Sequence, residues 1–147
     1  MEDFSAVQIL IVEDNPRDAE FTVRALRKNN LANDVVTARD GDEALDFLFC
    51  RGKYSKRSFS NPPKVVLLDL KLPKVSGLEV LKIIKEDLRT RNIPIVMVSS
   101  SREEPDIKKA YDLGVNSYVV KPVDFDDFVK AVSSLGLYWL LVNEQIK

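Results

Sequence analysis

The 147-residue chain contains no histidine. This absence excludes the Ser-His-Asp and Cys-His arrangements that activate a catalytic nucleophile, and it excludes every metal site with a histidine ligand. It also excludes a phosphohistidine within this chain. Any chemistry at a functional site must therefore rest on carboxylates, hydroxyls and lysines.

Cysteine, net charge and long apolar runs are also scarce. The single cysteine, Cys50, cannot form a disulfide within the chain, which favours a reducing compartment and predicts a cytoplasmic protein. The formal net charge of −1 argues against a nucleic-acid or membrane-surface partner, because both need a surplus of basic residues. The longest apolar stretch, residues 135–142, is far shorter than the roughly 20 residues that span a bilayer. No secretory signal is visible at the N-terminus.

Five short apolar runs alternate with five amphipathic segments. The runs lie at residues 7–12, 35–38, 64–69, 93–98 and 117–120. Uninterrupted apolar runs rich in Val and Ile are typical of strands buried on both faces. Their alternation with helices predicts an α/β fold with a doubly wound, five-stranded parallel sheet. With no repeat or linker visible, we expect one domain over residues 1–147, with its core at about 6–135.

Capping residues mark the predicted helix ends. Helices are expected to begin after Asn15, Asp40, Ser76 and Asp124, and the fourth helix, at about 103–113, to end before Gly114. The last helix is expected to extend over about 124–144. The buried stripe predicted for the third helix consists of Val80, Leu81, Ile84 and Leu88. Residues 51–63 carry four basic residues and end in Pro-Pro, so we expect an exposed, solvated loop there.

Polar side chains follow four of the five predicted strands. They are Glu13, Asp14, Asp69, Ser99 and Lys121. The carboxyl ends of parallel strands meet at one edge of the sheet, so these side chains should converge. Three adjacent carboxylates repel one another unless a cation intervenes, and Mg²⁺ is a hard cation that prefers oxygen ligands. Each residue alone could be a helix cap, a turn residue or a solvated lysine, but together they predict a site.

The chain resembles the receiver domain of two-component response regulators, which has a flavodoxin-like (βα)5 fold. The residues that carry the resemblance are Val12-Glu13-Asp14-Asn15, Leu68-Asp69-Leu70-Lys71-Leu72-Pro73 with Gly77, Ser99-Ser100 and Lys121-Pro122. The separations 99 − 69 = 30 and 121 − 69 = 52 match the usual receiver spacing. The insertion before the third strand and the long last helix are similar to stand-alone regulators paired with bacterial phytochromes.

The resemblance implies a role for each residue at this edge. Asp69 would be the phosphoacceptor, and Ser99 and Lys121 would bind phosphoryl oxygens. Mg²⁺ would be ligated by Asp14, by Asp69 and by the backbone carbonyl of Lys71, and Glu13 would act through water.

Tyr118 is the expected switch residue. It would turn into space vacated by Ser99, and the surface of the fourth helix, fifth strand and fifth helix would change with it. The alternative for Tyr118 is an ordinary half-buried aromatic of a strand.

The implied function is that of a stand-alone response regulator. It would take a phosphoryl group from a sensor histidine kinase, such as a phytochrome-type photoreceptor, and signal through protein contacts. It would not be an enzyme, although self-phosphorylation from small phosphodonors and slow autodephosphorylation are expected. One alternative is a pseudo-receiver that is never phosphorylated. Another is an Asp-based phosphatase of the haloacid-dehalogenase type, which wants a second acid two residues after the nucleophile, where this chain has Lys71.

The C-terminal run is apolar on all sides. An exposed helix of that kind is a liability, and aromatic residues are enriched at interfaces. We therefore expect a homodimer built on Leu137, Tyr138, Trp139 and Leu141. Packing of this run over its own domain is the alternative.

Overall fold

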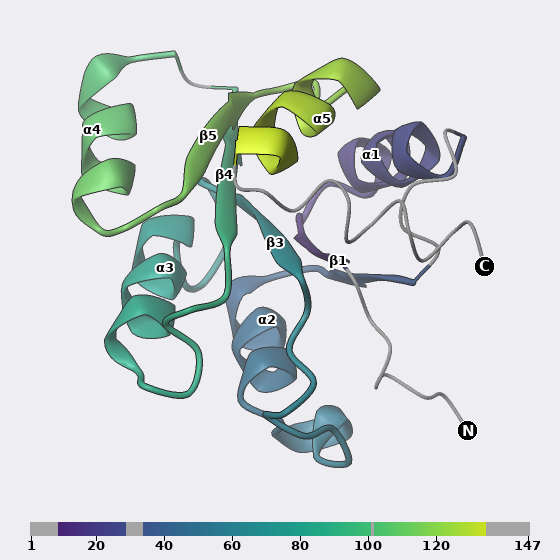
Figure 1. Cartoon of the computed structure of the whole chain (residues 1–147), viewed down its shortest axis with the longest axis vertical. Helices are drawn as coiled ribbons and strands as arrows, with labels where there is room; N and C mark the ends of the chain where they lie inside the picture. Colours follow the sequence, from purple (N-terminus) through teal and green to yellow (C-terminus); the bar gives the residue numbers. More distant parts are fainter. Residues whose placement is uncertain (1–8, 29–33, 101, 135–147) are drawn as a thin grey trace.

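The computed structural model describes residues 9–28, 34–100 and 102–134 (Figure 1). Its strands are β1 (Ile9–Val12), β2 (Val35–Ala38), β3 (Val65–Asp69), β4 (Ile95–Ser99) and β5 (Ser117–Val120). Its helices are α1 (Pro16–Lys28), α2 (Gly41–Leu48), the 3₁₀ helix η1 (Gly52–Tyr54), α3 (Gly77–Glu86), α4 (Glu104–Asp112) and α5 (Phe125–Ser134). The predicted alternation of strands and helices is confirmed.

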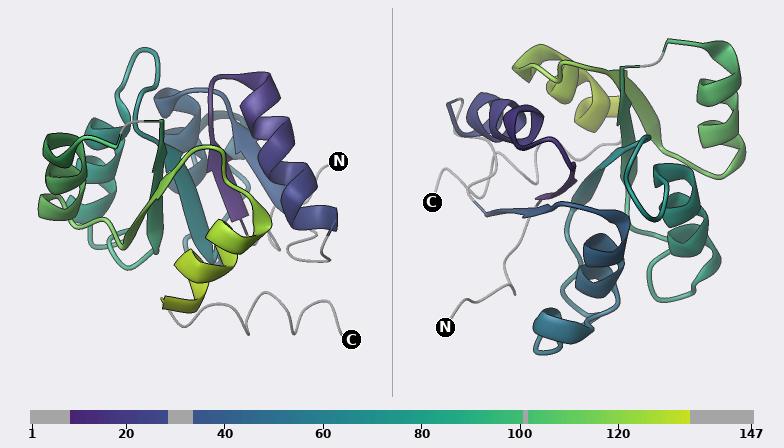
Figure 2. Two further views of the ribbon diagram at one scale, coloured as in Figure 1. Left: turned by 90° about the horizontal axis from the view of Figure 1, so that it is seen from above. Right: turned by 180° about the vertical axis from the view of Figure 1, so that it is seen from behind.

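The five strands form one parallel sheet in the order β2-β1-β3-β4-β5. Helices α1 and α5 cover one face, and α2, α3 and α4 cover the other (Figure 2). Along β1, Ile9 and Ile11 pack toward α1 and α5, whereas Leu10 and Val12 pack toward α2 and α3. This is why β1 is apolar at every position and β3 is apolar at every position before Asp69. Within the ranges described, no helix is both long enough and apolar enough to cross a bilayer.

The predicted caps begin and end most helices as expected. The side chains of Asp40, Ser76 and Asp124 each accept a hydrogen bond from the backbone N–H three residues later. Gly114 follows α4 with φ +97°, the left-handed conformation that glycine adopts without steric cost. The prediction for Leu88 was wrong. Helix α3 ends at Glu86, so Leu88 leaves the buried stripe and is 74% exposed.

The segment 51–63 after α2 is exposed at most positions, as its basic residues predicted, but part of it packs against α2. Tyr54 is only 3% exposed, and its ring packs edge-on against Phe47 with a centroid distance of 5.0 Å. The guanidinium of Arg57 lies 3.8 Å from the Phe47 ring centroid and donates hydrogen bonds to the carbonyl oxygens of Phe47 and Asn61. The segment therefore folds back onto α2, and the half-buried Arg57 contributes the stem of its side chain to this packing.

The C-terminal predictions concern residues that the structure does not describe. Helix α5 is described as far as Ser134, so the continuation of the helix to about 144 lies outside the described residues. The interface expected at Leu137, Tyr138, Trp139 and Leu141 also lies outside them.

Candidate functional site

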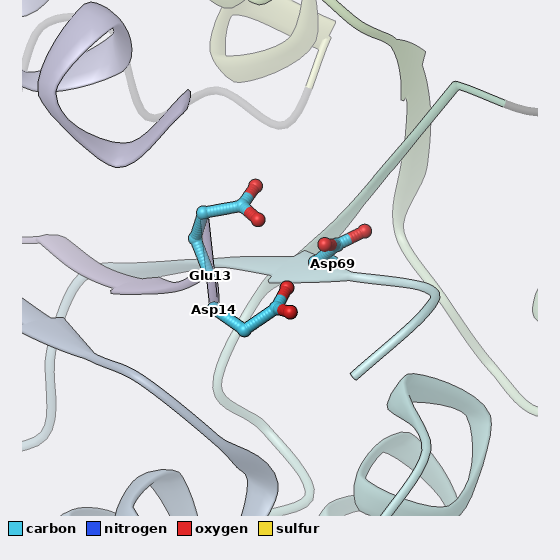
Figure 3. A group of neighbouring side chains, drawn as sticks. All are labelled: Glu13, Asp14 and Asp69. Atoms are coloured by element: carbon cyan, nitrogen blue, oxygen red, sulfur yellow. The ribbon is translucent and has the colours of Figure 1, made fainter. Parts of the chain in front are cut away.

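Three carboxylates meet at the carboxyl edge of the sheet. Glu13 and Asp14 follow β1, and Asp69 is the last residue of β3 (Figure 3). Their side chains point toward one another, and one oxygen of each lies within 4.8 Å of the others. Glu13 and Asp69 are buried, whereas Asp14 is exposed. The predicted convergence of these three residues is therefore observed.

Lys121 reaches into this group from the residue after β5. Its Nζ lies 2.6 Å from Glu13 Oε1 and 3.2 Å from Asp69 Oδ2. A third carboxylate, Asp18 Oδ2, lies 3.1 Å from the same nitrogen. Asp18 was not among the predicted site residues, because an acid in the first turn of a helix has an ordinary explanation there. Its position one turn after Asp14, beside the same strand end, is the signal that could have found it.

The electrostatics of the site are dominated by excess negative charge. Burial, together with the charge of Asp69, raises the pKa of Glu13 to about 7 despite the lowering effect of the Lys121 hydrogen bond. Burial on its own would lower the pKa of Lys121. The hydrogen bond to Glu13 and the charge of Asp69 outweigh burial, so the pKa of Lys121 is raised above its ordinary value. A single ammonium thus holds several carboxylates together.

The backbone around Asp69 depends on a glycine. The N–H of Gly77 donates to the carbonyl oxygen of Leu70 at 3.0 Å, which folds the β3–α3 loop back beneath Asp69. A Cβ at position 77 would lie 2.1 Å from the backbone carbonyl oxygen of Asp69. The side chain of Asp69 is itself held, because Oδ1 accepts the N–H of Lys71 at 3.3 Å. The loop therefore fixes both the position and the orientation of the Asp69 carboxylate.

Ser99 and Tyr118 occupy the neighbouring strands β4 and β5. Ser99 is buried at the end of β4, and its carbonyl oxygen accepts the N–H of Lys121 at 2.8 Å. This hydrogen bond joins the last residue of β4 to the residue that follows β5. Tyr118 is half-buried, pairs with Met97 in the β4–β5 register, and packs against the core on the α2–α3 side of the sheet. It therefore lies two positions before the pair of Ser99 with Val120.

The donor set suits a hard divalent cation. Three carboxylates offer only oxygen atoms at short mutual distances, and Mg²⁺ and Mn²⁺ favour such ligands. The excess negative charge would be relieved by such an ion, so the residues present fit it. The residues that would hold it are Glu13, Asp14 and Asp69.

Comparisons with known proteins agree with this geometry. A model of the response regulator receiver domain matches residues 9–133. The chain is 40% identical to the probable methanogenesis regulatory protein FilR2 of Methanothrix harundinacea, over 90% of this chain and 83% of FilR2. It is also similar to the structure of the bacteriophytochrome response regulator AtBRR, with a TM-score of 0.82 and 58% identity over 90% of this chain and 94% of that one.

A further solved structure bears on the cation. The Mn²⁺-bound form of the response regulator Rcp1 is 34% identical to this chain, with a TM-score of 0.74 over 91% of this chain and 94% of that one. Receiver domains bind Mg²⁺ or Mn²⁺ at an acidic pocket, and the cluster of Glu13, Asp14 and Asp69 is consistent with such a pocket. The receiver model, these relatives and the shared fold lead to one conclusion: the chain belongs to the response regulator receiver domain family.

Proposed function

We propose that this response regulator receives a phosphoryl group on Asp69 from a sensor histidine kinase and passes the signal on through protein contacts. The observation that carries the proposal is the environment of the Asp69 carboxylate. It is buried at a sheet edge, lies 3.2 Å from Lys121 and is grouped with two other carboxylates. A nucleophilic carboxylate beside a fixed cation is suited to attack on phosphorus.

In the proposed reaction an oxygen of Asp69 attacks the phosphorus of the donor. A P–O bond forms to Asp69 while the P–N bond to the kinase histidine breaks, and the released imidazole takes up a proton. Lys121 pairs with a phosphoryl oxygen, and the Ser99 hydroxyl donates to another. Asp14, Asp69 and the Lys71 carbonyl would hold Mg²⁺ directly and Glu13 through water. That ion supplies charge neutralisation between the attacking carboxylate and the phosphoryl group.

The phosphodonor must come from another molecule, because the chain has no histidine. A groove of about 460 Å³ borders Lys121 and contains Asp18, Phe21 and Pro122, and the Phe21 ring is about half exposed. We propose that the histidine-bearing segment of the kinase docks here.

The similarity to the bacteriophytochrome response regulator AtBRR supports a phytochrome-type kinase as the partner. The free Cys50 supports a reducing, cytoplasmic location.

Labelling with acetyl phosphate and Mg²⁺ tests the phosphoacceptor. We expect a base-labile adduct on the parent protein and none on Asp69→Asn. The matched control is Asp42→Asn, an exposed carboxylate on α2, which should label like the parent. Labelling that survives Asp69→Asn, or no labelling of the parent, contradicts the proposal. Loss of label after chelation of the divalent cation would support the cation requirement.

We propose that the output uses Ser99 and Tyr118. Movement of Ser99 toward the phosphoryl group would free space for the Tyr118 ring, and the surface of α4, β5 and α5 would change. Tyr118→Phe should leave labelling intact, while Tyr118→Ala should remove the phosphorylation-dependent shifts of amide resonances in α4. Equal shifts in the parent and Tyr118→Ala would contradict this role.

We also propose a homodimer built on Leu137, Tyr138, Trp139 and Leu141. Its support is the apolar, aromatic character of this run. Sedimentation should show a dimer for the parent and a monomer for Trp139→Ala. A monomeric parent of unchanged mass would contradict it.

The alternative functions are less well supported. An Asp-based phosphatase needs a second acid where Lys71 stands, and a pseudo-receiver has no need of the complete set of carboxylates, hydroxyl and lysine.

A further inference from the structure

Lys121 has one partner that stands apart from the other two. Glu13 and Asp69 are buried strand-end residues, and each side chain is 7% exposed. Asp18 comes from the first turn of α1, and its side chain is 46% exposed. It is also absent from the group of three carboxylates that could surround a cation. Because a lysine ammonium has three N–H donors, these three partners use its full capacity.

We infer that Asp18 is a positioning residue, which holds the Lys121 ammonium beside Asp69 when Glu13 and Asp69 serve a cation or a phosphoryl group. The inference rests on the proposed function. Carboxylate oxygens shared with a divalent cation attract an ammonium less strongly, so the hold of Glu13 and Asp69 on Lys121 weakens when the cation binds. Asp18 is the partner of Lys121 that lies outside the group of carboxylates proposed to hold the cation. The flexible side chain of Lys121 then keeps its ion pair with Asp18.

The backbone of Asp18 is fixed on both sides. Its N–H donates to Asn15 Oδ1 at 3.3 Å, and its carbonyl oxygen accepts the hydroxyl of buried Thr22 at 3.1 Å. These bonds set the first turn of α1 with the Asp18 carboxylate facing Lys121. Asp18 and Lys121 also line the same groove, into which the phosphodonor is proposed to dock. An anchor at this point therefore holds the ammonium on the donor side of Asp69.

A simpler role for Asp18 would be to complement the dipole of α1. A double-mutant cycle separates the two roles by measuring the rate of Asp69 labelling from acetyl phosphate at saturating Mg²⁺. The variants are Asp18→Asn, Lys121→Met and the double variant. Asp18→Asn should slow labelling about fivefold in the parent and less than about twofold in the Lys121→Met background, since contacting residues couple.

The matched control is Glu20→Gln. Glu20 is an acid on the same helix, but its partner is Arg24, at 2.5 Å, and not Lys121. This control removes the same charge without touching the Lys121 contact, and its labelling rate should equal that of the parent. Asp18→Glu keeps the carboxylate and should restore most of the rate. Urea unfolding of each variant confirms that the folded state is being compared.

Mn²⁺ binding without any phosphodonor is the second measurement. In Asp18→Asn, Lys121 has only Glu13 and Asp69 as partners and competes with the cation for them. The Kd for Mn²⁺ from calorimetry should rise about fivefold relative to Glu20→Gln, and this excess should vanish in the Lys121→Met background. A merely structural role for Asp18 would not produce that dependence on Lys121.

Failure of the inference is distinct from failure of the proposed function. If the parent does not label on Asp69, the proposed function fails. If the parent labels on Asp69 and Asp18→Asn behaves like Glu20→Gln, the positioning role is overturned. An effect of Asp18→Asn that persists undiminished with Lys121→Met overturns it as well.

Discussion

Two glutamates on one groove of about 680 Å³ have opposite electrostatic environments. Glu13 lies at the strand edge among carboxylates, and burial raises its pKa to about 7. Glu43 lies on α2 beneath the segment 51–63. Burial alone would raise the pKa of Glu43, but hydrogen bonds from the Arg39 N–H, the Tyr54 hydroxyl and Lys53 outweigh it and lower that pKa. The pKa values of these two glutamates are therefore shifted in opposite directions.

The difference separates a region with an excess of negative charge from one whose acid is paired with nearby donors. At the strand edge, negative charge exceeds positive charge, and an incoming cation would relieve the repulsion. In the segment 51–63, Lys53 pairs with Glu43, and Arg57 donates to backbone carbonyl oxygens and lies over the Phe47 ring. Such an arrangement is typical of a scaffold, whereas unrelieved charge is typical of a functional site.

Loss of a lysine should show this difference most strongly. Lys121→Met leaves Glu13 and Asp69 buried without their cation, so the free energy of unfolding should fall by about 3 kcal/mol at pH 8. Lys53→Met removes the exposed cation from Glu43 and should cost far less, because water screens an exposed ion pair. Urea unfolding without divalent cations measures both. Equal losses for the two variants would contradict the contrast.

The backbone of the strand edge should be the next most sensitive feature. Gly77→Ala places a Cβ 2.1 Å from the carbonyl oxygen of Asp69, so the loop must shift, at a cost of about 2 kcal/mol. Asp69 would move with it, and labelling from acetyl phosphate should fall at least about tenfold.

Gly114→Ala provides the comparison at a distant loop. Its φ of +97° makes alanine unfavourable, but the new Cβ would meet only ordinary contacts with Lys85. This variant should lose stability by about 1 kcal/mol and keep its labelling rate. A parallel loss of labelling in both variants would mean that stability alone controls the site.

The segment 51–63 should respond to mutation without affecting the site. Arg57→Ala removes the stem that packs over Phe47 together with the hydrogen bonds to two carbonyl oxygens. We expect a loss of about 1.5 kcal/mol, since release of a half-buried charge offsets part of the lost contacts. Chymotrypsin should then cleave near Tyr54 or Phe59, while labelling of Asp69 stays at the parental rate. Arg57→Met keeps the stem and should resist cleavage better; slower labelling in either variant would refute the separation of the two regions.

The strands and the acidic cluster could be predicted because their signals are local or topological. An uninterrupted apolar run such as Val65–Leu68 indicates a strand covered on both faces, and parallel topology then brings Glu13, Asp14, Asp69 and Lys121 to one edge. Capping residues gave most helix ends for the same reason. The strands and caps need only the residue type and its neighbours in the chain, and the acidic cluster needs the parallel topology as well.

Two of the three missed features depend on contacts between distant residues or on side-chain stems. Asp18 and Lys121 are 103 positions apart, and no local pattern distinguishes this acid from other helix-terminal acids. Arg57 looks solvated in the sequence because its charge is visible there and its contact with the Phe47 ring is not. Leu88 fits the helical period, but α3 ends two residues before it. Tertiary contacts decide the first two, whereas α3 ends at a local turn in which Asp87 Oδ1 accepts the Arg89 N–H.

The smallest expected effect is the contribution of Glu43 to the pH dependence of stability, which tests the contrast between Glu43 and Glu13. Its pKa is lowered in the folded state below the ordinary value of 4.5, so in the window between the two values the unfolded chain binds more protons. Its contribution is therefore fully present above the ordinary value and is lost as the pH falls through the lowered one. Glu43→Gln should reduce stability at about pH 6 more than at about pH 3.

Tyr54→Phe tests the origin of that effect. It keeps the ring against Phe47 but removes the hydroxyl that donates to Glu43 at 2.8 Å. The stability difference from the parent should again shrink at acid pH, by less than for Glu43→Gln, because the Arg39 N–H and Lys53 still hold the carboxylate. Urea midpoints across the acid range measure both variants. A difference for Glu43→Gln that grows as the pH falls would mean that burial outweighs these hydrogen bonds, and Glu43 would then resemble Glu13 instead of contrasting with it.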